Sequence, residues 1–377
     1  MDFHLSDEQR ALSNTLARFF AERLPLERRL ALAATAPGYS VEAWRQVAEL
    51  GALGALFPEV LGGYGGTPAD ILAVFEPLGA AAVAGPFLPS LICGLLLGAT
   101  STDGADHLLN EIIAGDAVVT LAHQEPGSRY ELSQVSARAE RVGDGWSISG
   151  AKAHVPWGEA ADHFIVSARS AGADADEAGL TLFVVPAGAP GLSLRGYLGV
   201  DGSRWAELSL DNVDVHDDQR LGGADTGFRL LESAVAAGVL AICADALGAL
   251  GVVRDSTVEY LRTRVQFGQP IGAFQALQHR MATLLVEIEQ ARSAVINAAA
   301  AFDDDRRERE RAIAAAKYTV GRVATLVAEE AVQLHGGIGM TWELPLSHSV
   351  KRLMMLDHLF GDVDHHIERY IQLGRAA

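Results

Sequence analysis

Cysteine is scarce in this sequence, which contains only Cys93 and Cys243 among 377 residues and no CxxC pair. A disulfide framework and a zinc ribbon are therefore excluded, and a reducing compartment is favoured. The start of the chain also lacks the basic and apolar segments of a signal peptide, and it predicts an amphipathic helix capped by Ser6. We expect a cytoplasmic protein.

Positive charge is scarce as well. Thirty Lys and Arg residues stand against 48 Asp and Glu residues, the net charge is -18, and no Lys/Arg cluster interrupts this balance. Because such a surface repels a phosphate backbone, we do not expect nucleic-acid binding. An anionic ligand would need a locally positive site on this acidic surface. With 49% apolar residues, the composition is typical of a globular fold of two or three domains.

Common catalytic motifs are also missing: there is no GxGxxG after a strand, P-loop, GxSxG or HExxH. An SxxK match at residues 149–152 lies in a β-rich stretch without its partner motifs and carries little weight. His358, Asp362 and His366 would share one face of an unbroken helix, but Gly361 interrupts them. A polar helix end or a subunit contact is therefore favoured over a metal site.

One apolar stretch has the length of a membrane span. Residues 234–253 contain a single charge, Asp245, in a segment rich in alanine and glycine. The segment is only weakly hydrophobic, and a lone carboxylate would be costly in lipid, so we predict a buried helix and no membrane span. Asp245 then needs a role of its own.

Residue periodicity divides the chain into three parts and predicts a mainly α fold with a middle antiparallel β domain. Helical spacing dominates residues 1–116, short alternating runs separated by Gly-rich turns fill 117–222, and helical spacing returns in 223–377. In the last part we expect a solvated turn at 303–311. The expected helices there are 227–264, 274–302, 308–335 and 346–374.

Five segments in a fixed order carry a family resemblance. They are MDFHLSDEQR, PEVLGGYGG, QEPGS, YLRTRVQFGQPIGAFQALQHRMA and AVQLHGGIGMTWELPLSHSVKR. Together they resemble the acyl-CoA dehydrogenase family over essentially the whole chain. The text from Gln124 to Glu140 and the final LFGDVDHH are most similar to the small subunit of pimeloyl-CoA dehydrogenase type enzymes.

The resemblance implies a helical domain, a β-barrel-like domain and a four-helix bundle, usually assembled as a dimer of dimers. It also implies FAD in the cleft between the β domain and the bundle, with its adenine end crossing to a neighbouring subunit. Arg264 offers a planar set of donors for pyrophosphate, and Phe267 could pack on the cofactor. Gln333 with the small Gly336 and Gly337 would let backbone amides approach phosphate or ribose. Read without the resemblance, these segments are a solvated helix end and a helix C-cap.

The expected flavin-facing segments differ from the family pattern. Gln124 is the first residue of QEPGS. In AKAHVPWGEAAD, His154 and Pro156 stand where the family usually has an aromatic residue and a Ser/Thr, and Trp157 lies next to Pro156. His154 could hydrogen-bond the flavin or only fill the space. The altered wall argues against ordinary fatty acyl chemistry.

The expected base is missing too. The resemblance implies a carboxylate that removes the α proton of an acyl thioester while a hydride leaves the β carbon for flavin N5. The usual Glu before Gly-Thr is replaced by Phe360, with Asp362 in place of the Thr, and the second family location falls on Gly238. Neither customary base is present.

Two carboxylates are candidates for this role. Asp245 lies two helical turns beyond Gly238 on the same face, and burial would raise its pKa, which suits a base. The alternative is a buried Asp paired to an Arg or capping a kink. Asp362 is the second candidate. If the subunit catalyses alone, Asp245→Asn or Asp362→Asn should abolish flavin bleaching while FAD stays bound.

The leading hypothesis is therefore an FAD-dependent acyl-CoA dehydrogenase for an unusual or bulky thioester, such as a dicarboxylic or sterol side-chain acyl group. Its electrons would pass to an electron-transferring flavoprotein. The chain would work as a homotetramer, or as one half of a heterotetramer whose other subunit brings the base. The alternatives are an oxidase or flavin monooxygenase on the same fold and a non-catalytic partner subunit.

Overall fold

The computed structural model describes residues 5–100, 102–223 and 226–375. Their packing divides the chain into two compact units. Unit 1 contains Met1–Leu26, Pro68–Val83 and Val239–Ala377, and unit 2 contains Glu27–Thr67 and Ala84–Gly238. The N-terminal helical segment thus supplies elements to both units, and each unit is described by itself.

Unit 2 combines helices with one sheet. Its helices are α2 (Leu26–Ala33), α3 (Val41–Glu49), α5 (Phe87–Gly98) and α6 (Asp103–Ala114), with 3-10 turns η1 (Gly54–Leu56) and η2 (Glu59–Leu61). Ser40 caps α3 and Thr102 caps α6, each accepting a hydrogen bond from a backbone amide of the first turn. Gly115 caps the C-terminus of α6 with a φ of 77°, a backbone conformation that glycine adopts at little cost.

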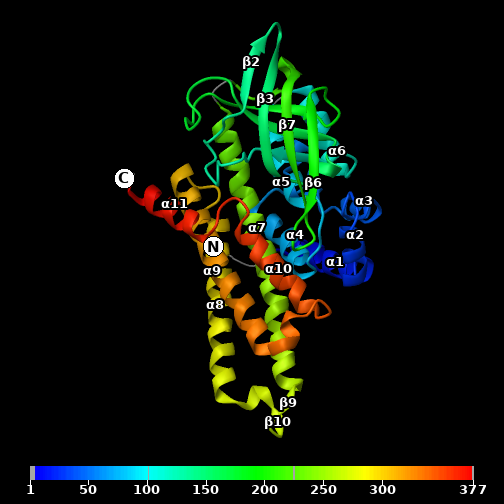
Figure 1. Cartoon of the computed structure of the whole chain (residues 1–377), viewed down its shortest axis with the longest axis vertical. Coiled ribbons are helices and arrows are strands. Elements are labelled where there is room, and N and C mark those ends of the chain that lie inside the picture. Colours follow the sequence, from blue (N-terminus) through cyan, green and yellow to red (C-terminus); the bar gives the residue numbers. More distant parts are fainter. Residues whose placement is uncertain (1–4, 101, 224–225, 376–377) are drawn as a thin grey trace. The chain divides into compact units, whose positions relative to one another are not determined.

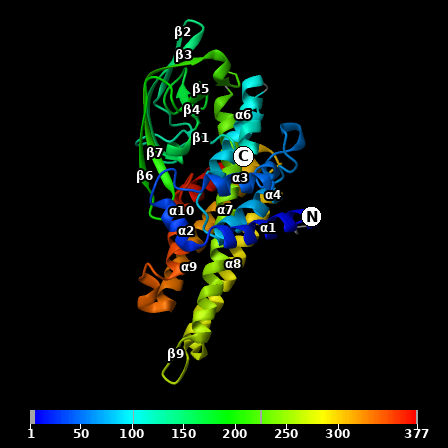
Figure 2. The ribbon, with the colours of Figure 1, turned by 90° about the vertical axis from the view of Figure 1, so that its right-hand side faces the viewer.

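Eight strands form the sheet of unit 2. They are β1 (Val119–Ala122), β2 (Arg138–Val142), β3 (Gly145–Pro156), β4 (His163–Arg169), β5 (Leu180–Pro186), β6 (Leu192–Leu198), β7 (Arg204–His216) and β8 (Arg220–Leu221), with 3-10 turns η3 (Gly158–Ala160) and η4 (Asp217–Gln219). The order is β6-β7-β3-β2-β4-β5-β8, and Figure 2 shows β6 and β7 side by side at one edge. Neighbouring strands are mostly antiparallel, as predicted, but β1 and β2 each pair in parallel with β4.

Alternate residues along these strands are apolar, and they form the core of unit 2. Phe164, Val166 and Ala168 on β4 pack with Phe183 and Val185 on β5, and all five are fully buried. Period-two spacing places such residues on one face of the sheet. The expected middle β domain is confirmed.

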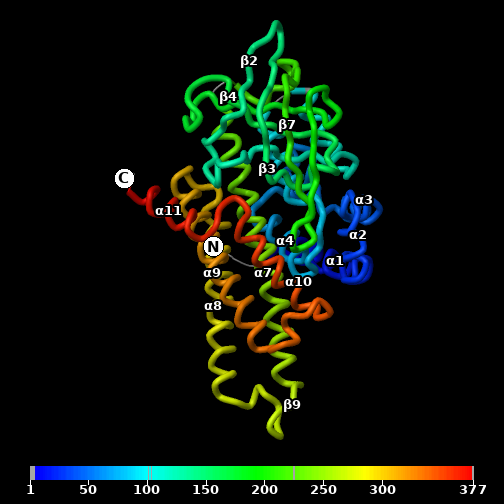
Figure 3. The backbone as a smooth tube through the Cα atoms, in the orientation of Figure 1, coloured from blue at the N-terminus to red at the C-terminus, as the bar shows by residue number. Residues whose placement is uncertain are grey.

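Unit 1 is helical. It contains α1 (Asp7–Arg23), α4 (Pro68–Ala80), most of α7 (Gly227–Thr263), α8 (Gln275–Ala300), α9 (Arg306–His335), α10 (Pro345–Asp357) and α11 (Val363–Arg375), with the small hairpin β9 (Val265–Gln266) and β10 (Gln269–Pro270) and 3-10 turns η5 (Ile271–Ala273) and η6 (Gly336–Met340). Helices α8 and α9 run side by side in opposite directions (Figures 1 and 3). Ser6 caps α1 in a capping box with Gln9, which confirms the predicted start of that helix.

Helix α7 contains the membrane-like stretch. It is long and apolar enough to cross a bilayer, but 89% of its most apolar 18-residue window is buried inside the protein. Small residues explain the close packing on α4: a Cβ on Gly79 would lie 1.8 Å from the carbonyl oxygen of Asp245, and one on Gly248 would lie 1.9 Å from that of Glu76. The predicted buried helix is confirmed.

Two local predictions are wrong. The segment 346–374 is not one helix, because α10 ends at Asp357 and α11 begins at Val363. Between them Phe360 has a φ of 53° and Gly361 a φ of 116°, which no α-helix accommodates. The expected turn at 303–311 also fails in its second half, since α9 begins at Arg306.

Candidate functional site

Two of the predicted cofactor segments meet at one end of the helices of unit 1. The rings of Tyr260 on α7 and His335 on α9 stack with their centroids 4.4 Å apart. Arg264 follows one turn later, its amide donating to the Tyr260 carbonyl at 2.9 Å, and Gly336 follows His335 directly. The stack therefore brings the RTRVQFG and QLHGG segments together, a contact between aromatic rings that the sequence did not indicate.

The predicted residues at this end are accessible. Phe267 is 90% exposed at the tip of the β9–β10 hairpin, with a φ of 53°. Arg264 and Gln333 are exposed, and within the described residues the Arg264 guanidinium has neither a hydrogen bond nor an ion pair. A Cβ on Gly336 or Gly337 would meet no atom within 4 Å. A free guanidinium on one of the two segments and open glycine backbone on the other fit a phosphate-bearing ligand.

The other predicted cofactor residues lie together in unit 2. The amide of Ala153 donates to the carbonyl of Gln124 at 2.8 Å, which joins the segment after β1 to the end of β3. Next to it His154 is exposed, with a φ of 51°, at an irregularity in the β3–β7 register between Lys152 and Val155. The carbonyl of Pro156 accepts a hydrogen bond from Thr120 at 2.6 Å. The bulge turns the His154 side chain out of the pleat.

Asp245 has a partner. Both of its carboxylate oxygens accept hydrogen bonds from the guanidinium of Arg352 on α10, with Nε to Oδ1 at 2.7 Å and Nη2 to Oδ2. Asp245 is 4% exposed. The structure thus shows the alternative weighed from the sequence, a buried aspartate paired to an arginine. Its role as a base stays a prediction, and the pairing counts against it.

Asp362 is the N-terminal cap of α11. Its Oδ1 accepts from the amide of His365 at 2.9 Å, and its carbonyl accepts from the amide of His366 at 3.0 Å. The break before α11 separates His358 from the other two members of the suggested metal group. No group of three potential metal ligands is found in the part of the chain that the structure describes.

A buried lysine fixes the segment that contains Phe360 and Asp362. The Nζ of Lys317 on α9 donates to the carbonyls of Asp357 at 2.7 Å and Gly361 at 2.8 Å. His366 adds a contact from its Nε2 to the Phe360 carbonyl at 3.0 Å. Burial lowers the pKa of Lys317 and raises that of Asp357.

Models of three consecutive domains match this chain. The acyl-CoA dehydrogenase N-terminal domain matches residues 6–116, the middle domain 120–213 and the C-terminal domain 225–370. The chain belongs to the acyl-CoA dehydrogenase family. Members of this family use FAD to dehydrogenate acyl-CoA thioesters, so the chain is an FAD-dependent acyl-CoA dehydrogenase.

Relatives within the acyl-CoA dehydrogenase family cover almost the whole chain. Benzylmalonyl-CoA dehydrogenase from Aromatoleum aromaticum is 30% identical over 361 residues, 93% of each chain. The solved Tcur3481-Tcur3483 steroid ACAD is 29% identical with a TM-score of 0.89, covering 99% of this chain and 100% of that one. The ChsE4-ChsE5 complex from Mycobacterium tuberculosis is 25% identical with a TM-score of 0.88, covering 99% and 98%. The closer likeness to a pimeloyl-CoA dehydrogenase small subunit stays a prediction.

Sequence reasoning missed a buried polar network in this dehydrogenase. Lys152, considered only as part of the SxxK match, is 1% exposed, and its Nζ lies 2.6 Å from Oε1 of Glu125. Glu125 stands in the QEPGS segment and Lys152 two residues before His154. An isolated lysine in an apolar strand was the available clue, because a buried ammonium needs a partner.

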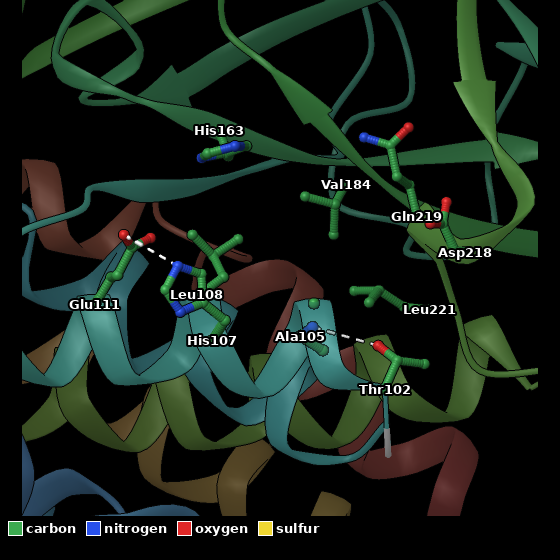
Figure 4. A pocket seen from close by; sticks show the side chains of 11 residues that line it. Thr102, Ala105, His107, Leu108, Glu111, His163, Val184, Asp218, Gln219 and Leu221 are labelled. Carbon is green, nitrogen blue, oxygen red and sulfur yellow. Dashed lines mark hydrogen bonds and ion pairs between the residues drawn. The ribbon is translucent and has the colours of Figure 1, made fainter.

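A separate recess of about 470 Å³ lies in unit 2 of the dehydrogenase (Figure 4). His107 and Glu111 of α6 face it, with Nε2 and Oε1 3.5 Å apart, opposite His163 of β4 and Asp218 of η4. None of the predicted cofactor residues lines it. It is therefore distinct from the predicted cofactor segments.

Proposed function

We propose that this chain provides an FAD site of a two-chain acyl-CoA dehydrogenase and that a homologous partner subunit provides the base. The observation that carries this proposal is the engagement of both candidate carboxylates. Asp245 is held by Arg352, and Asp362 caps α11. A general base needs a carboxylate oxygen directed at the proton that it removes. Two structurally similar proteins, the ChsE4-ChsE5 complex and the Tcur3481-Tcur3483 ACAD, each carry two chain names, which supports a paired assembly.

Each unit contains candidate FAD contacts. Arg264 would bind a phosphate with its fork of donors, and Gly336 and Gly337 would offer backbone amides at the same end of the helices. When bound, FAD supplies the acceptor for the hydride that leaves the β carbon. The other proposed contacts are Phe267, Gln333, Gln124, His154 and Pro156.

The partners follow from this chemistry. An acyl-CoA with a bulky or dicarboxylic acyl group would be the substrate, since the flavin-facing wall is altered. An electron-transferring flavoprotein would reoxidise the cofactor, and the assembly would be a heterotetramer, with a homotetramer as the alternative. The free, buried Cys93 and Cys243 fit a cytoplasmic location.

Asparagine variants of the two carboxylates test this proposal. We expect Asp245→Asn and Asp362→Asn to leave flavin bleaching by acyl-CoA intact in the assembly with the Glu-bearing homologous subunit. Anaerobic absorbance of the flavin is the measurement. Replacing the partner's glutamate by glutamine is the matched control and should stop bleaching.

Two results would contradict the proposal. Loss of bleaching in Asp245→Asn or Asp362→Asn, with FAD still bound, would assign the base to this chain. Rapid peroxide formation in air would instead favour an oxidase or monooxygenase.

A further inference from the structure

The ammonium of Lys152 is enclosed by three acceptors from two segments of unit 2, the loop after β1 and strand β4. Besides Glu125 Oε1 at 2.6 Å, its Nζ donates to Oγ of Ser167 on β4 at 3.1 Å and to the carbonyl of His123 at 3.2 Å. All three ammonium protons therefore have a partner. The side chain has no exposed surface, so Lys152 itself does not reach a ligand.

Glu125 extends the network to the far end of the same loop. Its Oε2 accepts from the amide of Ser136 at 2.7 Å, and its Oε1 accepts from the amide of Ala137 at 3.0 Å. The loop of residues 123–137 is therefore tied at its start and at its end to one ion pair. This loop contains Gln124, a proposed cofactor contact.

The strand that carries Lys152 contains the other proposed contacts of unit 2. Ala153 follows Lys152 and donates to the Gln124 carbonyl at 2.8 Å, and His154 comes next. Fixing the ammonium thus fixes both chain segments that would face the flavin. A buried and fully bonded group of this kind suits the support of a site better than contact with a ligand.

The groups around the ammonium of Lys152 are hydrogen-bond acceptors, a neutral ring and one balancing carboxylate. An ammonium can only donate, so Ser167 accepts from Lys152, and its Oγ also forms a hydrogen bond with Nδ1 of His123, 2.9 Å away. Burial and the lysine charge lower the pKa of His123 to about 3, so its ring is neutral. Arg169 is the other nearby cation, and Glu125 balances the lysine.

We propose that Lys152 is a positioning residue for FAD: its ammonium holds the 123–137 loop against the end of β3 in the geometry that binds the cofactor. The inference rests on the proposed FAD site. It predicts that loss of the ammonium weakens FAD binding, although Lys152 does not touch the cofactor.

Affinity for added FAD, read from flavin fluorescence, tests this inference. The protein is the full chain, stripped of FAD, together with any partner subunit that copurifies. Lys152→Met should bind FAD about tenfold to a hundredfold more weakly, the effect of losing a hydrogen bond to a charged group. The double variant Lys152→Met/Glu125→Gln, which strands no buried charge, should remain weakened to a similar extent. Val185→Ala, a fully buried core residue of β5, is the stability control and should bind FAD normally.

The pH dependence of FAD affinity is a second measurement. A purely structural role of Lys152 would not change it. Burial lowers the pKa of Lys152 to about 8, although the negative charge of Glu125 and its hydrogen bond act to raise this pKa. FAD affinity of the wild type should therefore fall as the pH rises through about 8, and the double variant should lack this decline. Wild-type affinity in the double variant, or the same decline with pH, would overturn the inference. Absence of FAD binding in the wild type would instead overturn the proposed function.

Discussion

Two lysines are buried in the part of the chain that the structure describes, one in each unit, and different groups stabilise their ammonium charges. Lys152 lies in the sheet of unit 2 with a carboxylate 2.6 Å from its Nζ. Lys317 lies in α9 of unit 1, and its Nζ donates to two carbonyl oxygens while the nearest carboxylate, that of Asp357, is 3.9 Å away. Both are 1% exposed.

The two buried lysines connect different kinds of segment. Lys152 joins a loop to a strand through a charged partner. Lys317 instead binds the last carbonyl of α10 and a carbonyl of the following loop, where the helix end has partial negative charge and lacks internal donors. The first ties together the segments proposed to face the flavin, and the second fixes the segment in which the resemblance predicts the family's base.

The largest expected effect is that of Lys152→Met on the stability of unit 2. Glu125, which is 6% exposed, would lose the ammonium that pairs with it, and breaking such a buried pair costs about 3–5 kcal/mol. Urea unfolding followed by tryptophan fluorescence measures this, because four of the five tryptophans lie in unit 2. Lys152→Met/Glu125→Gln should recover part of the loss. A single variant as stable as the wild type would show that the pair is not coupled to folding.

Lys317→Met should have a smaller effect, confined to unit 1. Two buried carbonyls would lose their donor, at a cost of about 2 kcal/mol, and no fully paired carboxylate would be stranded. Hydrogen exchange of the amides between α10 and α11 should become faster, while FAD affinity stays at the wild-type value. Weakened FAD binding in this variant would remove the proposed distinction between the two lysines.

The smallest expected effect is the alkaline dependence of stability. Burial lowers the pKa of Lys152 from 10.5 to about 8, so between these values the unfolded chain binds more protons than the folded one. The free energy of unfolding should therefore gain about 1 kcal/mol from this group between about pH 8 and pH 9. Urea titrations at several pH values should show the gain in the wild type and in Lys317→Met. Because burial also lowers the pKa of Lys317, Lys152→Met alone should keep a part of the gain, and its full persistence in Lys152→Met/Lys317→Met would assign the titration to another group.

Much of the fold could be predicted because long helical periods are local properties of a sequence. Helices α7, α8 and α9 begin and end within two residues of the expected positions. The break between α10 and α11 could not be placed, although Gly361 was visible. It depends on Lys317, whose Nζ contacts a carbonyl 44 residues along the chain.

The candidate site was predictable to a smaller extent. Family motifs selected Arg264 and the two glycines after His335, but the Tyr260–His335 stack that brings them together joins residues of different helices. Asp245 was recognised as a buried charge, while its partner Arg352 lies 107 residues away. Pairings over such separations depend on tertiary packing, which residue spacing alone does not reveal.

On the proposed function, this chain binds FAD and lacks a base of its own. The most direct test is anaerobic addition of acyl-CoA thioesters, pimeloyl-CoA and a sterol side-chain acyl-CoA among them, to the isolated chain and to its assembly with the Glu-bearing homologue. We predict that the isolated chain retains oxidised flavin and that the assembly is bleached. Bleaching of the isolated chain, abolished by Asp245→Asn or Asp362→Asn, would contradict the claim.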